Sequence, residues 1–205
     1  AHYLWDKYGA SHKARFVSVP FDGVVKEILE NVEDGHMGVI LKRMMYRAAE
    51  QVADMIKLDT FVTGESIAQV SSQTLTNLAV IDKVTDKLVL RPLVVMDKPE
   101  IISISRQIGT EAFAATMPEY CGVISVKPTT EAKMAKVLAE EAKFDLAVLD
   151  KAVEASSVAD DINADADVSK EKTASILTDE IKSKEVLEGT VNINDAACAK
   201  HEAHN

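Results

Sequence analysis

One stretch decides the fold class of this chain: residues 41–64, with the sequence LKRMMYRAAEQVADMIKLDTFVTG. Its apolar residues recur every three or four positions, which is the period of an α-helix with one buried face. They are Leu41, Met44, Met45, Ala48, Val52, Met55 and Ile56. A run rich in β-branched residues, 60–63, follows and stops at Gly64, which predicts a strand. A helix followed at once by a short strand predicts one unit of an α/β fold.

The same alternation continues on both sides of this stretch. The predicted strands are residues 16–19 and 88–90, and the predicted helices are residues 22–32, 97–108 and two more within 129–155. Asp97 is a typical N-cap and Gly109 a typical helix end. Short apolar strands alternating with amphipathic helices predict an α/β fold with a doubly wound parallel sheet.

Composition limits what the protein can do. The chain has 205 residues, 47% of them hydrophobic, and a net charge of −10. Because the whole is acidic, RNA binding would have to use a local basic patch. Aromatic residues make up only 5% of the chain, which excludes an aromatic sugar groove or a base-stacking platform as the main means of ligand binding.

Cysteine content and hydropathy indicate a cytoplasmic protein. Cys121 and Cys198 are the two cysteines, too few for a disulfide framework. No apolar run approaches the roughly 18 residues of a membrane span. The first residues lack both the regions of a signal peptide and an initiator Met, so we expect a chain entered midway and no membrane contact.

Charge divides the chain near Ser156. Residues 1–156 carry 18 basic and 22 acidic side chains, whereas residues 157–205 carry 5 and 11. The second stretch combines small residues with repeated acids and has little to bury, which predicts a flexible acidic linker or tail. We therefore expect a folded domain over 1–156.

Polar residues after the strand at 60–63 are candidates for ligand binding. Ligands of open parallel sheets lie at the carboxyl ends of the strands, where residues 64–66 and 69–74 follow. Lys98, at the start of a predicted helix, could also reach an anion. The alternative is that these residues only supply turn chemistry and helix caps.

Three basic residues lie outside the apolar stripe of the helix at 41–56. Lys42, Arg43 and Arg47 could hold phosphate oxygens or an RNA backbone. The alternative is a solvated helix face that pairs with acids such as Glu50 and Asp54.

The cysteines and histidines give weaker signals. Cys121, flanked by Pro118 and Gly122, is either a reactive thiol in a loop or a small buried apolar residue. Cys198, His201 and His204 have the spacing of metal ligands, but no second cluster completes a site, so we predict no metal centre in the protein. The phosphate-binding motifs G-x-x-x-x-G-K-[ST] and Ser-Gly-Gly-x-Asp-Ser are absent.

Taken in order, several motifs resemble the tRNA uracil 4-sulfurtransferases, also called tRNA 4-thiouridine synthases, a family of thiamine biosynthesis sulfur-transfer proteins. They are GVILKRMM at 38–45, VTGESIAQVSSQTL at 62–75, LRPL at 90–93, Asp97-Lys98, RQIGT at 106–110 and MPEYCGVI at 117–124. The resemblance runs from residue 1 to about residue 155. It covers most of that family's ATP pyrophosphatase domain.

The resemblance implies a PP-loop ATP pyrophosphatase fold of the adenine nucleotide alpha hydrolase type, here incomplete at its N-terminus. It implies that ATP, with Mg²⁺, activates C4 of a tRNA uridine as an adenylate. Sulfur then comes from a cysteine desulfurase as a persulfide, and the same sulfur feeds thiamine thiazole synthesis through a sulfur carrier protein. It also implies a homodimer.

The resemblance also assigns residues. Lys42, Gly64 and Gln73 match nucleotide-binding positions, Lys98 is a phosphate contact, and Cys121 matches the redox-active cysteine. Cys121 would form a disulfide with a persulfide-carrying cysteine of a rhodanese-like domain beyond residue 157, and the setting of Cys198 does not match that partner.

Two departures bear on activity. The Ser-Gly-Gly-x-Asp-Ser loop and the N-terminal RNA-binding modules of the family lie upstream of Ala1, so we expect little or no turnover from this chain alone. The alternatives are a noncatalytic, sulfur-accepting fragment and a PP-loop enzyme that thiolates another tRNA base.

Overall fold

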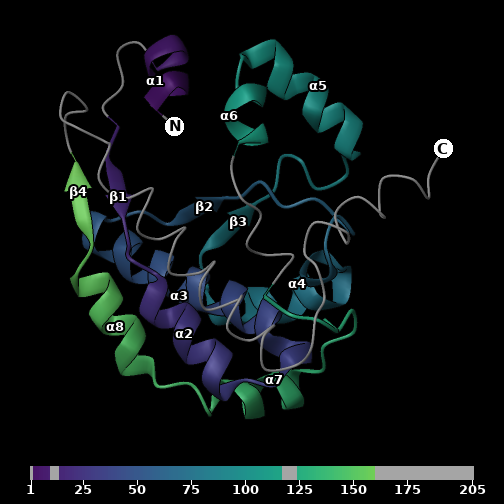
Figure 1. Ribbon diagram of the computed structural model, residues 1–205. Coiled ribbons are helices and arrows are strands. Elements are labelled where there is room, and N and C mark those ends of the chain that lie inside the picture. The colour runs from purple at the N-terminus through teal and green to yellow at the C-terminus, as the bar shows by residue number, and fades with distance from the viewer. Residues whose placement is uncertain (1, 10–13, 117–123, 160–205) are drawn as a thin grey trace. The chain divides into compact units, whose positions relative to one another are not determined.

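Figure 1 shows the protein as a computed structural model, which describes residues 2–9, 14–116 and 124–159. The chain divides into two compact units, Ala1–Ile162 and Asn163–Asn205. All the described residues belong to the first unit, and the fold below is the fold of that unit.

The order of helices and strands confirms the α/β class. The elements are α1 (His2–Tyr8), β1 (Phe16–Ser18), α2 (Asp22–Asn31), η1 (Asp34–His36), α3 (Met37–Ile56), β2 (Thr60–Val62), η2 (Ser71–Gln73), α4 (Leu75–Ile81), η3 (Asp82–Val84), β3 (Leu88–Leu90), α5 (Lys98–Ile108), α6 (Glu111–Ala115), α7 (Met134–Glu141), α8 (Leu146–Glu154) and β4 (Ser157–Ala159). The helices predicted over 22–32, 41–56 and 97–108 and the strand over 88–90 are all present. None of the helices in these described ranges is long and apolar enough to cross a membrane.

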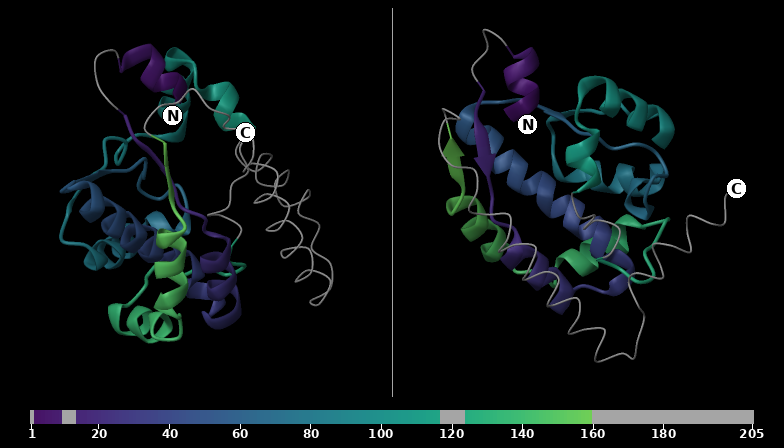
Figure 2. Two further views of the ribbon diagram at one scale, coloured as in Figure 1. Left: turned by 90° about the vertical axis from the view of Figure 1, so that its left-hand side faces the viewer. Right: turned by 45° about the horizontal axis from the view of Figure 1, so that its top comes forward.

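The helix α3 is the centre of the core. Its residues Ile40 and Met44 are completely buried, and the helix contacts α2, α4, α7 and α8. Figure 2 shows α3 lying against α2 and α8. The predicted apolar stripe is only partly buried, since Met45 and Met55 remain exposed.

The strands β2 and β3 pair in parallel, as the sequence predicts. Phe61 lies opposite Val89, and both pack on the buried core, whereas their neighbours Val62, Leu88 and Leu90 are exposed. Because the two strands run in the same direction, their carboxyl ends meet at one edge of the sheet. That edge positions the candidate site.

The other strand pair differs from the expectation. The strand predicted at 16–19 pairs antiparallel with β4 and forms a separate two-stranded sheet. Figure 1 shows these two strands side by side at the end of α8. The sequence of 157–159 was expected to begin a linker, but its backbone finds hydrogen-bond partners in β1, which polar composition alone does not reveal.

The helix α5 begins and ends at capping residues that the sequence indicates. The backbone N–H of Asp97 donates to Glu100 Oε2 over 3.0 Å, which is half of a capping box. At the other end, Gly109 adopts a φ of 83°, a left-handed conformation that favours glycine. Its neighbour in space is Tyr3 of α1, whose hydroxyl would clash with a Cβ at that position. Gly109 therefore ends α5 and, because it has no side chain, leaves room for Tyr3 of α1.

Candidate functional site

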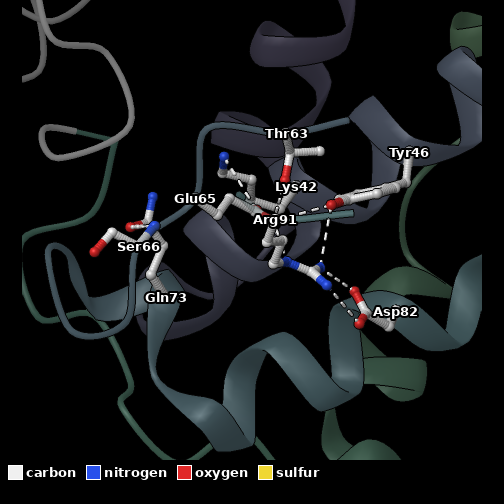
Figure 3. Close-up of polar contacts among 8 residues, drawn as sticks. All are labelled: Lys42, Tyr46, Thr63, Glu65, Ser66, Gln73, Asp82 and Arg91. Carbon is white, nitrogen blue, oxygen red and sulfur yellow. Dashed lines mark hydrogen bonds and ion pairs between the residues drawn. The ribbon is translucent and has the colours of Figure 1, made fainter. Parts of the chain in front are cut away.

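The candidate site lies where β2 and β3 end. In the segment after β2, Gly64 is exposed while Glu65 and Ser66 are buried. Arg91 follows β3 directly. Parallel pairing brings these two chain segments to the same edge of the sheet, where Lys42 and Tyr46 of α3 also reach (Figure 3).

The carboxylate of Glu65 lies at the centre of the site and contacts residues from several segments of the chain. Its Oε2 accepts hydrogen bonds from Arg91 Nε at 2.8 Å, Tyr46 Oη at 2.9 Å and Thr63 Oγ1 at 3.1 Å. The side chain of Glu65 is 4% exposed. Three donors on a single oxygen fix the plane of this buried carboxylate.

The other oxygen of Glu65 faces Lys42. Lys42 Nζ lies 3.5 Å from Oε1, and no described residue donates a hydrogen bond to that buried oxygen. The distance is that of an ion pair and is longer than a good hydrogen bond. The side chain of Lys42 is 14% exposed, so its ammonium lies at the boundary between the buried network and solvent.

Arg91 completes a balanced set of charges. Its Nη1 donates to Asp82 Oδ2 at 3.0 Å and its Nη2 to Tyr46 Oη at 3.2 Å, and Nη2 also pairs with Asp82 Oδ1. Two cations, Lys42 and Arg91, thus meet two carboxylates, Glu65 and Asp82. Unpaired, such partly buried charges would cost several kcal/mol, on the order of 3–5.

The pKa values of the site follow from burial and these contacts. Burial alone would raise the pKa of Glu65, but the Arg91 hydrogen bond and the charge of Lys42 outweigh it and lower that pKa. Burial, together with the charge of Glu65, raises the pKa of Tyr46 to about 12. Burial works against the charge of Arg91, but hydrogen bonds to Asp82 and Glu65 raise its pKa. At neutral pH Glu65 is therefore an anion and Tyr46 a donor.

A second set of contacts ties the loop after β2 to its surroundings. Gln73 Oε1 accepts from the backbone N–H of Ser66 at 3.3 Å, and Ser66 Oγ donates to the carbonyl of Met96 at 2.8 Å. A Cβ added to Gly64 would meet no atom within 4 Å. The backbone at Gly64 thus borders open space, where a ligand can approach it closely.

Three of the four predicted nucleotide-binding residues meet at this edge. Lys42 reaches Glu65, the residue after Gly64, and Gln73 binds the residue after that. Lys98 is exposed at the first turn of α5, two residues after Met96, to which Ser66 is bonded. The structure therefore brings Lys42, Gly64 and Gln73 to one edge and places the start of α5 two residues beyond Met96, which the same loop contacts.

Arg43 needs a correction. Its side chain is 2% exposed, its Nε donates to Glu141 Oε2 at 3.0 Å, and its Nη1 donates to the carbonyl of Val80 at 2.6 Å. A guanidinium buried in this way is not available to an RNA backbone. Arg47 Nε donates to Glu141 Oε1 at 2.8 Å, and its side chain is 33% exposed. The partner of both arginines is thus Glu141 of α7, which sequence proximity could not indicate.

The cysteines and the C-terminal histidines lie outside the described residues: Cys121, Cys198, His201 and His204. The chain that follows residue 123 is described, and Asp34 holds it. Asp34 accepts from the backbone N–H of Val126 at 2.9 Å and of Lys127 at 2.8 Å. Ile124 and Ser72 both approach Gly38, at the start of α3. The segment that begins at Ile124 is therefore anchored next to η2, which carries Gln73.

Sequence reasoning missed the residues that organise the site. Tyr46, Asp82 and Arg91 were not among the candidates, and Glu65 was noted only as part of a polar stretch. Arg91 could have been found, because it follows the strand at 88–90 in the way that Gly64 follows the strand at 60–63. Within the described ranges, no group of three His, Cys, Asp or Glu side chains could hold a metal ion.

Comparison with known proteins identifies similar sequences. The family model described as "Thiamine biosynthesis protein (ThiI)" matches residues 1–146. The tRNA sulfurtransferase of Shewanella loihica is 62% identical over 160 residues, 78% of this chain and 33% of that protein. The tRNA sulfurtransferase of Aeromonas salmonicida is 64% identical over 153 residues, 75% of this chain and 32% of that protein. The chain thus spans about a third of the length of these relatives.

A solved structure is similar as well. It is described as the crystal structure of a 4-thiouridine synthetase–RNA complex with bound ATP. The TM-score is 0.70 with 28% sequence identity, over 77% of this chain and 42% of that chain. The α/β fold described above is therefore the fold of that part of the synthetase.

Proposed function

The chain belongs to the thiamine biosynthesis protein (ThiI) family, and on that premise we propose that it forms the ATP-binding part of a tRNA sulfurtransferase that thiolates uridine at C4. The observation that carries the proposal is the meeting of Lys42, Gly64 and Gln73 at the carboxyl edge of a parallel strand pair. We assign this part to residues 1–156 together with β4, which pairs with β1, and treat the rest of residues 157–205 as the connection toward a rhodanese-like domain.

The residues at this edge suit an adenine nucleotide. The ammonium of Lys42 offers a positive charge to phosphate oxygens, and Lys98, exposed at the first turn of α5, offers a second one. The open space beside Gly64 lets a base or ribose contact the backbone without a clash. The Mg²⁺ expected with ATP remains a prediction, and we propose no protein ligands for it.

The chemistry we propose has two stages. In the first, O4 of the uridine attacks the α-phosphate of ATP, pyrophosphate leaves, and C4 acquires an adenylate as its leaving group. In the second, the terminal sulfur of a persulfide attacks C4, and AMP leaves. Lys42 and Lys98 would offset the charge that develops on phosphate during the first stage.

The role proposed for Cys121 completes the second stage. Its thiolate attacks the sulfur of the donor cysteine in the C4–S–S linkage. The S–S bond breaks, the thiolated base leaves, and Cys121 forms a disulfide with the donor. A dithiol reductant then restores both thiols. We further propose a cysteine desulfurase as the source of the persulfide, and a sulfur carrier protein of thiazole synthesis as a second acceptor.

Of the two arginines that the sequence suggested for nucleic-acid binding, we keep one. Arg47 keeps this role because a third of its side chain is exposed, whereas we withdraw Arg43 because it is buried against Glu141. A homodimer and a cytoplasmic location remain predictions.

The experiment that tests the proposal uses a chimera. Residues 1–156 replace the matching segment of the Shewanella loihica tRNA sulfurtransferase, which supplies the remaining length. We expect ATP–pyrophosphate exchange that depends on tRNA, and 4-thiouridine in the digested product. A Cys121→Ser chimera should keep the exchange and lose multiple-turnover thiolation.

The alternatives predict other outcomes. A chimera that folds but shows no exchange above background would leave the chain as a noncatalytic, sulfur-accepting fragment. Sulfur found at C2 instead of C4 would identify an enzyme that acts on another tRNA base. Equal loss of exchange and thiolation in the Cys121→Ser chimera would make the cysteine structural.

A further inference from the structure

Glu65 joins the lysine of the candidate nucleotide site to the ends of both parallel strands. We propose that Glu65 is the positioning residue for Lys42, holding its ammonium where the phosphates of the nucleotide bind. This role rests on the proposed function, because it assumes that Lys42 binds ATP. The side chain of Glu65 is 4% exposed, so it acts through Lys42 and does not itself contact the ligand.

The orientation of Glu65 is fixed independently of Lys42. Oε2 accepts from Arg91, Tyr46 and Thr63, which belong to three different segments of the chain. Rotating the carboxylate would break these bonds, which are strengthened by the negative charge of the acceptor. Oε1 is therefore held in one direction, toward Lys42 Nζ.

The contact to Lys42 is of a different kind. At 3.5 Å, Nζ is attracted by the charge of Oε1 but is farther away than in a good hydrogen bond. An ammonium has three N–H donors, which remain available for phosphate oxygens. Glu65 therefore restricts where the ammonium lies without using up its donors. In protein kinases, a glutamate likewise forms an ion pair with the lysine that binds the phosphates.

Removal of the charge of Glu65 alone should release Lys42. Glu65→Gln keeps the length of the side chain and an acceptor oxygen for Arg91, Tyr46 and Thr63. It leaves Lys42 without the carboxylate that it pairs with, because the remaining carboxylate of the network, that of Asp82, is bonded to Arg91. We then expect Lys42 to turn toward solvent, and the site to lose its preorganised cation.

The test is a double-mutant cycle on ATP binding by the whole 205-residue chain, measured by titration calorimetry. The four proteins are the parent chain, Lys42→Met, Glu65→Gln and the double variant. We expect Glu65→Gln to raise the Kd for ATP about tenfold, by analogy with the loss of affinity when a residue that orients a metal ligand is removed. In the Lys42→Met background the same change should alter the Kd by less than about twofold, because Glu65 then has nothing to position.

A matched control separates positioning from stability. Glu141→Gln also neutralises a buried carboxylate, 8% exposed, that pairs with basic residues of α3, namely Arg43 and Arg47. It should lower the thermal midpoint and leave the Kd for ATP unchanged. If Glu65→Gln does not fold, Glu65→Asp replaces it in the cycle, because it keeps the charge and withdraws it by one methylene.

The outcomes distinguish the two proposals. Unchanged or tighter ATP binding in Glu65→Gln, or an equal loss in both backgrounds, would overturn the positioning role while ATP binding itself stands. If the parent chain binds ATP no better than Lys42→Met does, Lys42 does not hold the nucleotide in this chain and the role of Glu65 fails, whereas the exchange assay on the chimera decides the proposed function.

Discussion

Arg91 Nε donates to Glu65 Oε2 over 2.8 Å, so that the residues following β3 and β2 are bonded to each other at the edge where the two strands end. The bond connects positions 26 residues apart in the chain. It makes the candidate site a rigid junction of two strand ends and α3, because Glu65 also binds Tyr46 and pairs with Lys42.

The junction should depend strongly on Arg91. Arg91→Met leaves the carboxylates of Glu65 and Asp82 without their guanidinium, and breaking a buried pair of this kind costs about 3–5 kcal/mol. Urea unfolding followed by circular dichroism measures the loss. Arg106→Met is the control, because the Arg106 side chain is 66% exposed and its pair with Glu111, screened by solvent, should contribute little to stability. Equal effects of the two variants would contradict the account.

Gly64 should matter for binding and not for folding. No atom lies within 4 Å of a Cβ added there, so Gly64→Ala should change the free energy of unfolding by less than about 0.5 kcal/mol. If the nucleotide occupies that space, the added methyl group should weaken ATP binding. Calorimetric titration with ATP measures this, and unaltered affinity would place the nucleotide elsewhere.

Gly109 should behave in the opposite way. Its φ of 83° and the Tyr3 hydroxyl, which occupies the space that a methyl group would need, both oppose a side chain, so Gly109→Ala should destabilise the protein by more than about 1 kcal/mol. Gly23→Ala, in α2, is the control and should be neutral or stabilising, because its nearest contact would be an ordinary 3.5 Å. Thermal unfolding of the two variants should therefore shift in different directions.

Stability should fall in acid through Glu140. Burial would raise its pKa, but the hydrogen bonds from Lys143, the Glu33 backbone and Lys136 lower it from 4.5 to about 2. The folded state therefore binds this proton less readily than the unfolded chain does. The stabilisation is fully present above pH 4.5 and is lost as the pH falls toward 2, by at most about 3 kcal/mol.

The measurement is the free energy of unfolding between pH 6 and pH 3, taken from urea titrations at roughly half-unit steps. Glu140→Gln should unfold more easily than the parent at pH 6 and show a shallower decline below it. A decline of the same steepness in both proteins would assign the acid sensitivity to other carboxylates, of which Glu65, with its lowered pKa, is the first to examine.

Local patterns in the sequence predicted local structure well. The strand β3 and the helix α5 begin and end near the predicted residues, because the apolar pattern and the caps Asp97 and Gly109 act over a few positions. The helix α3 ends at the predicted residue but begins at Met37, four residues earlier than predicted. The helix α4 was not predicted. Thr74 caps its N-terminus, because the Thr74 hydroxyl accepts from the backbone N–H of Asn77. The buried Asn77 interrupts the apolar pattern and donates to the carbonyls of Ser71 and Thr129.

Contacts between residues far apart in the chain could not be predicted from local sequence patterns. Arg43 and Glu141 are 98 residues apart, and nothing near Arg43 in sequence indicates that its partner lies on α7. The antiparallel pairing of β1 with β4 depends in the same way on two distant segments. For the site, the resemblance supplied Lys42, Gly64 and Gln73, but the pairing of Lys42 with the carboxylate of Glu65 emerged only from the fold.

The central claim is that the adenine nucleotide binds at the carboxyl edge of β2 and β3, and photolabelling with an azido-adenine analogue of ATP tests it most directly. Trypsin releases residues 58–83 as one peptide, which contains Gly64, Glu65 and Gln73. The account predicts that the label lies on this peptide and that excess ATP prevents its incorporation. A label that lies mainly on other peptides, or that ATP does not displace, would contradict it.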